Sequence, residues 1–186
     1  MVPLLAGYAI ALLFFLGLPW SYRVNLAFAT DIARTRRTSA VLGTVHLVAL
    51  ALPLVVVWCG DGLATDSCIA WAAIAVMSFA LLLQRRAQRL LGSSFTLALQ
   101  STSEQEICQR GPYRWIRHPG YLAQILLWIG LAVTSQSLGV IVIIAIVVIA
   151  GYSYRIIEEE HMLTEVVGDR YLDYAVATKR LIPGIW

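Results

Sequence analysis

The amino-acid sequence predicts an all-α integral membrane protein with five transmembrane helices and a cytoplasmic C-terminal helical segment. Of its 186 residues, 59% are hydrophobic and only 13% are charged, whereas soluble domains have about 45–50% and about 25%. Five apolar stretches recur along the chain, and the basic residues fall between them in a consistent pattern. The composition excludes a soluble or a disordered chain. The net charge of +3 is small and dispersed, so we expect no nucleic-acid partner.

The five stretches are close to the length of a spanning helix, which needs about 20 mostly apolar residues. They are continuous rather than alternating, which excludes a closed β-barrel. The first one has no Lys or Arg before its apolar run, the reverse of a secretory signal, so we expect a spanning helix there. The predicted spans are residues 2–19, 40–58, 68–84, 120–136 and 138–154.

The distribution of basic residues predicts the topology. With five spans, all fourteen Lys and Arg residues fall on one side, whereas the loop 59–67 holds Asp61 and Asp66 and no base. The positive-inside rule makes the basic side cytoplasmic, with the N-terminus outside and the C-terminus inside. The basic residues are Arg23, Arg34, Arg36, Arg37, Arg85, Arg86, Arg89, Arg110, Arg114, Arg117, Arg155, Arg170, Lys179 and Arg180.

Features inside the spans predict how the helices pack. Only residues 135–137 separate the last two spans, so we expect a tight antiparallel hairpin. Gly130, Gly139 and Gly151 are expected to permit close helix packing. His46 is alone within the second span, and a hydrogen bond inside the bundle is the expected way to satisfy it.

The cysteines carry no metal or redox motif. Cys59, Cys68 and Cys108 contain no C-x-x-C spacing, which argues against a zinc ribbon or a thioredoxin-like site. Cys59 and Cys68 are either free thiols or a loop disulfide. The chain also lacks G-x-G-x-x-G, a P-loop and H-E-x-x-H, so we expect no dinucleotide fold, no nucleotide-phosphate loop and no metal site.

A first group of candidate functional residues precedes the fourth span, in the stretch 111–121. Pro119 suits the first turn of a helix and keeps His118 out of the helical region. Arg114 and Arg117 add positive charge beside the free N–H groups of that helix start, which together predict an anion site. The alternative is an ordinary flank of Arg residues with an aromatic belt.

A second group follows the fifth span. Arg155 and Glu159 are four residues apart and can pair on one helix face. Gly168 is expected to end this helix, and Asp169 is expected to cap the next one. Glu158, Glu165 and Asp169 resemble a solvated face, which leaves Glu159 and Glu160 as the functional candidates. The alternative is a charged helix that lies on the membrane surface.

A third group is Tyr171-x-x-Tyr174, followed by residues 179–183. Taken by itself, this group would indicate a terminal anchor at the membrane interface.

Together the three groups resemble the isoprenylcysteine carboxyl methyltransferase (ICMT) family, within the wider group that includes phospholipid methyltransferases. The resemblance covers about residues 85–186. One departure is Gln105, where many members have His. The motifs are Leu91-Gly92 with Ser94-Phe95, Gly111-Pro112-Tyr113-Arg114, Arg117-His118-Pro119-x-Tyr121, Glu159-Glu160-x-x-Leu163, Gly168-x-x-Tyr171-x-x-Tyr174 and Arg180-x-x-Pro183.

The length and the apolar spans predict a single membrane domain over residues 1–186, with three N-terminal helices in 1–84. The resemblance implies that residues 85–186 are the catalytic portion. It implies that S-adenosylmethionine is the cofactor and S-adenosylhomocysteine the product, in a pocket capped by the C-terminal helices. The implied cofactor residues are Ile107, Tyr113, Arg117, His118, Pro119, Tyr121 and Glu159. The implied catalytic residues, including those that orient the acceptor, are Arg155, Glu160 and Arg180.

The implied reaction is methyl transfer to a lipophilic or prenylated acceptor that enters from the bilayer, in particular the carboxylate of an isoprenylcysteine-like or isoprenoid substrate. Such a carboxylate is ionised at neutral pH, so it needs orientation, for which an Arg is suited. A lipid amine or a small thiol would need deprotonation, by His118 or Glu160. The remaining alternatives are an NADPH-dependent membrane reductase and a non-catalytic membrane scaffold.

Overall fold

The computed structural model describes residues 1–16, 32–60, 67–91 and 107–184. The regular secondary structure in these ranges is helical, apart from one isolated parallel bridge between Ile116 and Lys179. Arg23, Asp61, Asp66 and Gln105 lie outside the described residues.

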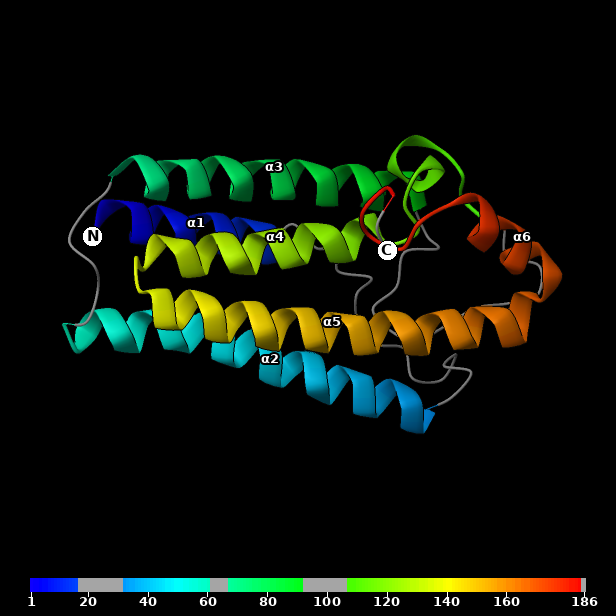
Figure 1. Ribbon diagram of the computed structural model, residues 1–186, viewed down its shortest axis with the longest axis horizontal. Coiled ribbons are helices and arrows are strands. Elements are labelled where there is room, and N and C mark those ends of the chain that lie inside the picture. The colour runs from blue at the N-terminus through cyan, green and yellow to red at the C-terminus, as the bar shows by residue number, and fades with distance from the viewer. Residues whose placement is uncertain (17–31, 61–66, 92–106, 185–186) are drawn as a thin grey trace.

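The long helices run lengthwise and alternate in direction along the chain (Figure 1). The short helices η4 and α6 lie together at one end of this bundle, where α3 and α5 end and α2 and α4 begin. The helices are α1 (Val2–Leu16), α2 (Ile32–Trp58), α3 (Ser67–Leu91), η4 (Gly111–Arg114), α4 (Pro119–Thr134), α5 (Leu138–Val167) and α6 (Asp169–Ala177).

The described part of each predicted apolar span lies on one of the long helices, except residues 135 and 136, which follow the end of α4. Residues 17–19 of the first span lie outside the described residues. Three helices are longer than predicted. α2 begins at Ile32 rather than 40, α3 continues to Leu91 rather than 84, and α5 continues to Val167 rather than 154. All three extensions contain charged or polar residues such as Arg, Gln and Glu, which favour helix almost as well as Leu, so an apolar count marks only part of each helix.

Three of the described helices have the length and the apolar composition of membrane spans. α2, α3 and α5 are long and apolar enough to cross a membrane, while α1 and α4 are apolar but shorter. Large apolar side chains point outward along the bundle, among them Leu47, Phe79, Leu82, Ile146 and Ile149. A continuous apolar exterior of this kind suits lipid rather than water. Five spans remain a prediction.

Two of the three glycines permit close helix contacts, as expected. A Cβ at Gly130 would lie 2.5 Å from Met77 Cγ of α3, and one at Gly151 would lie 2.6 Å from Val45 Cγ2 of α2. The expectation for Gly139 is wrong, because in the described part of the chain no atom of another helix lies within 4 Å of the corresponding position. Gly139 lies in the first turn of α5, where side chains of the other helices do not reach it.

Other packing expectations are confirmed. α4 and α5 form a hairpin whose turn includes Gln136 at φ 56°. His46 Nε2 lies 2.8 Å from the Tyr152 hydroxyl inside the bundle. Cys59 and Cys68 are exposed free thiols.

The lengths of α4 and α5 create space for a site. The 30 residues of α5 span about 45 Å, but the 16 residues of α4 span only about 24 Å. Because the two helices are level at their hairpin, the end of α5 extends beyond the start of α4. Gly168, at φ 68°, ends α5 as predicted. It also occupies the N-cap position of α6, so Asp169 is the first residue of that helix and the expectation that it caps α6 is wrong.

Candidate active site

The C-terminal segment 178–184 fixes the residues that precede α4. The Lys179 N–H donates to the Trp115 carbonyl at 3.1 Å, and the Arg117 N–H donates to the Lys179 carbonyl at 2.7 Å. The His118 N–H then donates to the Arg180 carbonyl at 3.1 Å. This short parallel pairing places the side chains of Arg117, His118 and Arg180 at the end of α5.

Glu160 of α5 is the centre of an ionic cluster. Arg117 Nε donates to its Oε1 at 2.8 Å, and Arg180 Nε donates to its Oε2 at 2.8 Å. His118 Nε2 lies 3.2 Å from Oε1. The Glu160 side chain is only 11% exposed. A buried carboxylate with three such partners is held as an anion in one orientation.

Arg117 also connects the cluster to α6. Its Nη1 donates to the carbonyl oxygens of Ala175 at 2.8 Å and Thr178 at 2.6 Å. These groups lie at the C-terminal end of α6, where helix carbonyls lack internal partners. The planar guanidinium therefore links three separate parts of the chain, which a Lys ammonium would not do with the same geometry.

A second polar group lies next to the first, around Glu159. Tyr121 donates its hydroxyl hydrogen to Glu159 Oε2 and accepts from Arg155 Nε at 3.2 Å. Arg155 is 2% exposed and also donates to the Thr38 hydroxyl of α2. The i, i+4 spacing indicated that Arg155 and Glu159 can pair on one helix face, and the Tyr121 hydroxyl binds both side chains. The His118 and Tyr121 rings stack with centroids 5.7 Å apart, which joins the two polar groups.

Two tyrosines of α6 border the cluster. Tyr174 donates its hydroxyl hydrogen to the Tyr113 carbonyl at 2.8 Å. Tyr171 is 4% exposed, and its hydroxyl has no hydrogen-bond partner among the described residues. Burial raises the pKa of both phenols above the usual value, so both stay protonated at neutral pH.

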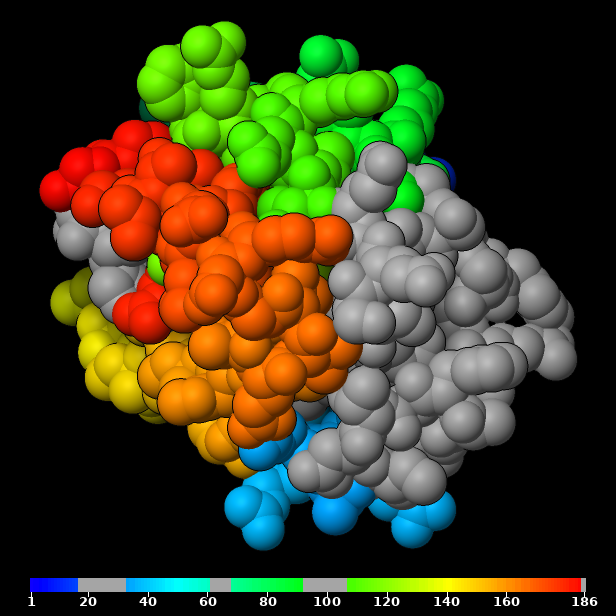
Figure 2. Space-filling model, turned by 90° about the vertical axis from the view of Figure 1, so that its right-hand side faces the viewer, coloured from blue at the N-terminus to red at the C-terminus, as the bar shows by residue number. Residues whose placement is uncertain are grey.

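A pocket of about 590 Å³ lies between the segment before η4 and α6. Figure 2 views this end of the molecule, where the surface of α6 lies beside the chain around η4. The pocket wall contains apolar side chains, one amide side chain, one acidic side chain and one basic side chain. The lining residues are Ile107, Gln109, Arg170, Asp173, Tyr174 and Ala177.

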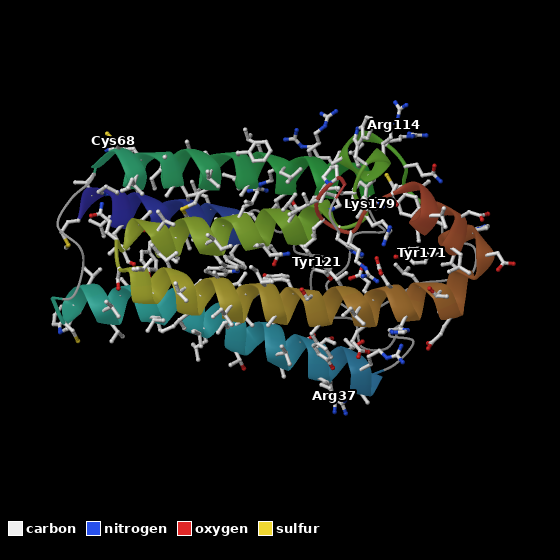
Figure 3. All side chains as sticks on the ribbon, viewed as in Figure 1. Arg37, Cys68, Arg114, Tyr121, Tyr171 and Lys179 are labelled. Atoms are coloured by element: carbon white, nitrogen blue, oxygen red, sulfur yellow. The ribbon has the colours of Figure 1, made fainter. Side chains whose placement is uncertain are left out.

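The structure gathers the predicted site residues at this end of the bundle. Pro119 is the first residue of α4 and His118 its N-cap, as predicted. Tyr113 is buried under α6, and Ile107 lines the pocket instead of contacting the ionic cluster. In Figure 3, Tyr121 and Tyr171 lie at this end, with Lys179 nearby and Cys68 at the opposite end.

Several contributing residues were not predicted. Thr38 binds Arg155 from a helix with no diagnostic motif, and the Thr178 carbonyl binds Arg117. Arg34 pairs with Glu158 at 3.2 Å and with Glu165 at 3.3 Å, so these two carboxylates are not simply solvated. A single Thr or Arg in an ordinary helix gives no local signal of such a partner.

Comparison with known proteins identifies the class. The family model for phospholipid methyltransferases matches residues 68–170, which is more than half of the chain. The protein therefore belongs to the phospholipid methyltransferase family, a family of membrane methyltransferases that act on lipophilic substrates. No curated protein matches the chain. The match covers α3 to the start of α6, including Arg117, His118, Tyr121, Glu159 and Glu160.

Proposed function

We propose that the protein transfers a methyl group from S-adenosylmethionine to a lipophilic acceptor, in particular the carboxylate of an isoprenylcysteine-like or isoprenoid substrate. The observation that supports this most is the pair Glu159 and Glu160, held by residues 117–121 at the end of a membrane helix bundle. The family match supplies the reaction class. The sequence resemblance supplies the narrower acceptor class.

The pocket suits S-adenosylmethionine. Its volume of about 590 Å³ lies within the range of about 300–1,000 Å³ usual for small-molecule sites. Ile107 and the Tyr174 ring offer an apolar wall for a purine, while Asp173 and Arg170 complement the ammonium and carboxylate of an amino-acid group. Members of the family generally use this cofactor. When bound, it supplies a methyl group that passes to the acceptor oxygen as the S–C bond breaks, leaving S-adenosylhomocysteine.

Arg180 is the best candidate to orient an acceptor carboxylate. Its Nε is bound to Glu160, but its side chain is 34% exposed, so it lies at the edge of the cluster. An ionised carboxylate needs no base, and its reaction depends on orientation in a water-poor site. Arg155 is 2% exposed and bound to Thr38 and Tyr121, which favours a role in positioning Tyr121 and Glu159.

Glu160 and Glu159 take different roles in this proposal. Glu160 has a structural role, because the side chains of Arg117, His118 and Arg180 already bind its two oxygens. Glu159 has one oxygen bound to Tyr121, and its negative charge would offset the positive charge of the bound cofactor. His118 and Pro119 set the start of α4 and so fix Tyr121.

A phospholipid amine is the second candidate acceptor, favoured by the family that the chain matches. An ammonium cannot accept a methyl group until it loses a proton, so this reaction needs a base. Glu159 and His118 are the candidates near the site.

We also propose a five-span topology with the N-terminus outside and the active site on the cytoplasmic side. The supporting observation is that the basic residues described in α2, α3, the segment 107–118 and α6 lie at one end of the bundle. An apolar acceptor would then reach the site from the bilayer, beside the projecting part of α5.

The test supplies purified protein in mild detergent with S-adenosylmethionine labelled on the methyl group. N-acetyl-S-farnesylcysteine and phosphatidylethanolamine are offered in parallel. A methyl ester releases labelled methanol in alkali, whereas a methylated amine does not, so the two products are distinguishable. The proposal predicts alkali-labile product that falls at least tenfold in Arg180→Ala and not in Arg114→Ala, an exposed Arg stacked on Trp115. Alkali-stable product would replace the carboxylate acceptor with an amine.

A further inference from the structure

We propose that the Tyr171 hydroxyl donates a hydrogen bond to a ribose hydroxyl of the bound S-adenosyl group. This inference rests on the proposed function and adds one cofactor-contacting residue to it. The sequence motif around Tyr171 indicated only an interfacial anchor or a family feature, without a role for the hydroxyl.

Tyr171 has a polar atom that the protein leaves unsatisfied. The residue is 4% exposed, and its hydroxyl oxygen is buried without a hydrogen-bond partner in the described part of the chain. Buried hydroxyls in native proteins nearly always have a partner, and each exception needs a physical explanation. A ligand that binds here would supply the missing partner.

Tyr174 provides an internal comparison. It is buried on the same helix, one turn later, and its ring meets that of Tyr171 edge to face, with centroids 6.3 Å apart. Its hydroxyl, however, donates to the Tyr113 carbonyl at 2.8 Å. One phenol therefore holds α6 against η4, while the other has the same burial and no such bond.

Tyr171 belongs to α6, the helix that lines the pocket and binds the ionic cluster. Tyr174, against which its ring packs, lines the pocket. Arg117 of the cluster donates to the Ala175 carbonyl of the same helix at 2.8 Å. In Figure 3, Tyr171 lies on α6 near the end of α5, at the same end of the bundle as Tyr121.

The chemistry of this position selects an uncharged acceptor atom. Burial and the nearby Glu160 carboxylate raise the pKa of the Tyr171 phenol, so the hydroxyl remains a donor. In the arrangement proposed above, Asp173 and Arg170 of the pocket wall take the amino-acid group and the Tyr174 ring takes the purine. The ribose is the uncharged polar part that remains for the Tyr171 hydroxyl, whose ring packs against Tyr174.

The experiment measures thermal unfolding and dissociation constants of the full chain in mild detergent. The ligands are S-adenosylhomocysteine and 5′-methylthioadenosine, which keeps the ribose and lacks the amino-acid group. Tyr171→Phe removes only the hydroxyl. The proposal predicts an unchanged or higher midpoint without ligand, and roughly tenfold weaker binding of both ligands. Tyr174→Phe is the matched control for a structural hydroxyl and should lower the midpoint without ligand.

The outcomes separate this inference from the proposed function. If neither ligand stabilises the wild-type protein, the proposed function fails. If both stabilise it and Tyr171→Phe binds them equally well, the inference alone fails. If Tyr171→Phe weakens only S-adenosylhomocysteine, the contact is to the amino-acid group and the ribose assignment is wrong. If Tyr171→Phe lowers the midpoint as Tyr174→Phe does, the hydroxyl is structural and the inference also fails.

Discussion

Arg117 and Glu160 are 43 positions apart in the sequence and form a buried ion pair, with 2.8 Å between Nε and Oε1. The pair joins the start of α4 to the projecting part of α5. Arg117 also binds two carbonyls at the end of α6. The end of the molecule that holds the candidate site is therefore organised around the Glu160 carboxylate and the Arg117 guanidinium. Removal of either group should lower both the stability and the proposed activity.

Glu160→Ala should destabilise the protein by about 3–5 kcal/mol, because it leaves the buried Arg117 charge without compensation. Unfolding midpoints in mild detergent measure this. Glu165→Ala is the matched control, since the Glu165 side chain is 63% exposed and pairs only with Arg34 among the described residues. Its cost should be about 1 kcal/mol or less. Equal losses in the two variants would show that the cluster is not a structural centre.

Tyr121→Phe should lower kcat/KM about 10- to 100-fold, because it leaves Glu159 and Arg155 without the hydroxyl that lies between them. Steady-state methyl transfer to whichever of the two acceptors is methylated in the assay described above measures the effect. Tyr154→Phe, at a partly exposed position of α5, should stay within about twofold of wild type. Wild-type turnover in Tyr121→Phe would remove this hydroxyl from the active site.

Gly151→Ala should cost about 1–3 kcal/mol, because its Cβ would lie 2.6 Å from the β-branched Val45 side chain. Gly139→Ala should be neutral or stabilising by up to about 1 kcal/mol, because nothing lies within 4 Å and Ala favours helix. Unfolding of both variants in detergent compares them. A stabilising Gly151→Ala would mean that α2 and α5 do not pack as described.

The proposed topology predicts opposite labelling of two single-cysteine proteins. Cys59 is exposed at the end of α2 and should react with a membrane-impermeant maleimide in intact cells. A Cys introduced by Arg114→Cys, at an exposed position of η4, should react only after permeabilisation. Labelling of the Arg114→Cys protein in intact cells would contradict a cytoplasmic active site.

The sequence predicted a helix boundary correctly where the residues next to that boundary determine it. The Pro119 ring and the residue before it fix the start of α4, and Gly168 ends α5 with the positive φ that suits glycine. The motif residues Arg117, His118, Tyr121, Glu159 and Glu160 lie together in the fold, and their roles in the reaction stay predictions. The apolar count did not reveal the full length of α5, because polar residues continue the same helix.

The pairings within the site could not be predicted from spacing. The partners of Glu160 are 43, 42 and 20 positions away, and Thr38 is 117 positions from Arg155. Only the folded arrangement of α2, α4, α5 and the C-terminal segment brings them together. The spacing of Arg155 and Glu159 correctly placed them on one face of α5. The Tyr121 hydroxyl that binds both comes from α4, so this contact could not be predicted without knowing where α4 lies.

The central claim is that the protein binds S-adenosylmethionine and transfers its methyl group. The most direct test is thermal unfolding of the purified protein with and without S-adenosylhomocysteine, with NADPH as the comparison. A ligand at 100 times its dissociation constant adds about 2.7 kcal/mol to stability, which gives a clear shift. The proposed methyltransferase should be stabilised by S-adenosylhomocysteine and not by NADPH. Stabilisation by NADPH alone would contradict methyl transfer and assign the pocket to a reductase.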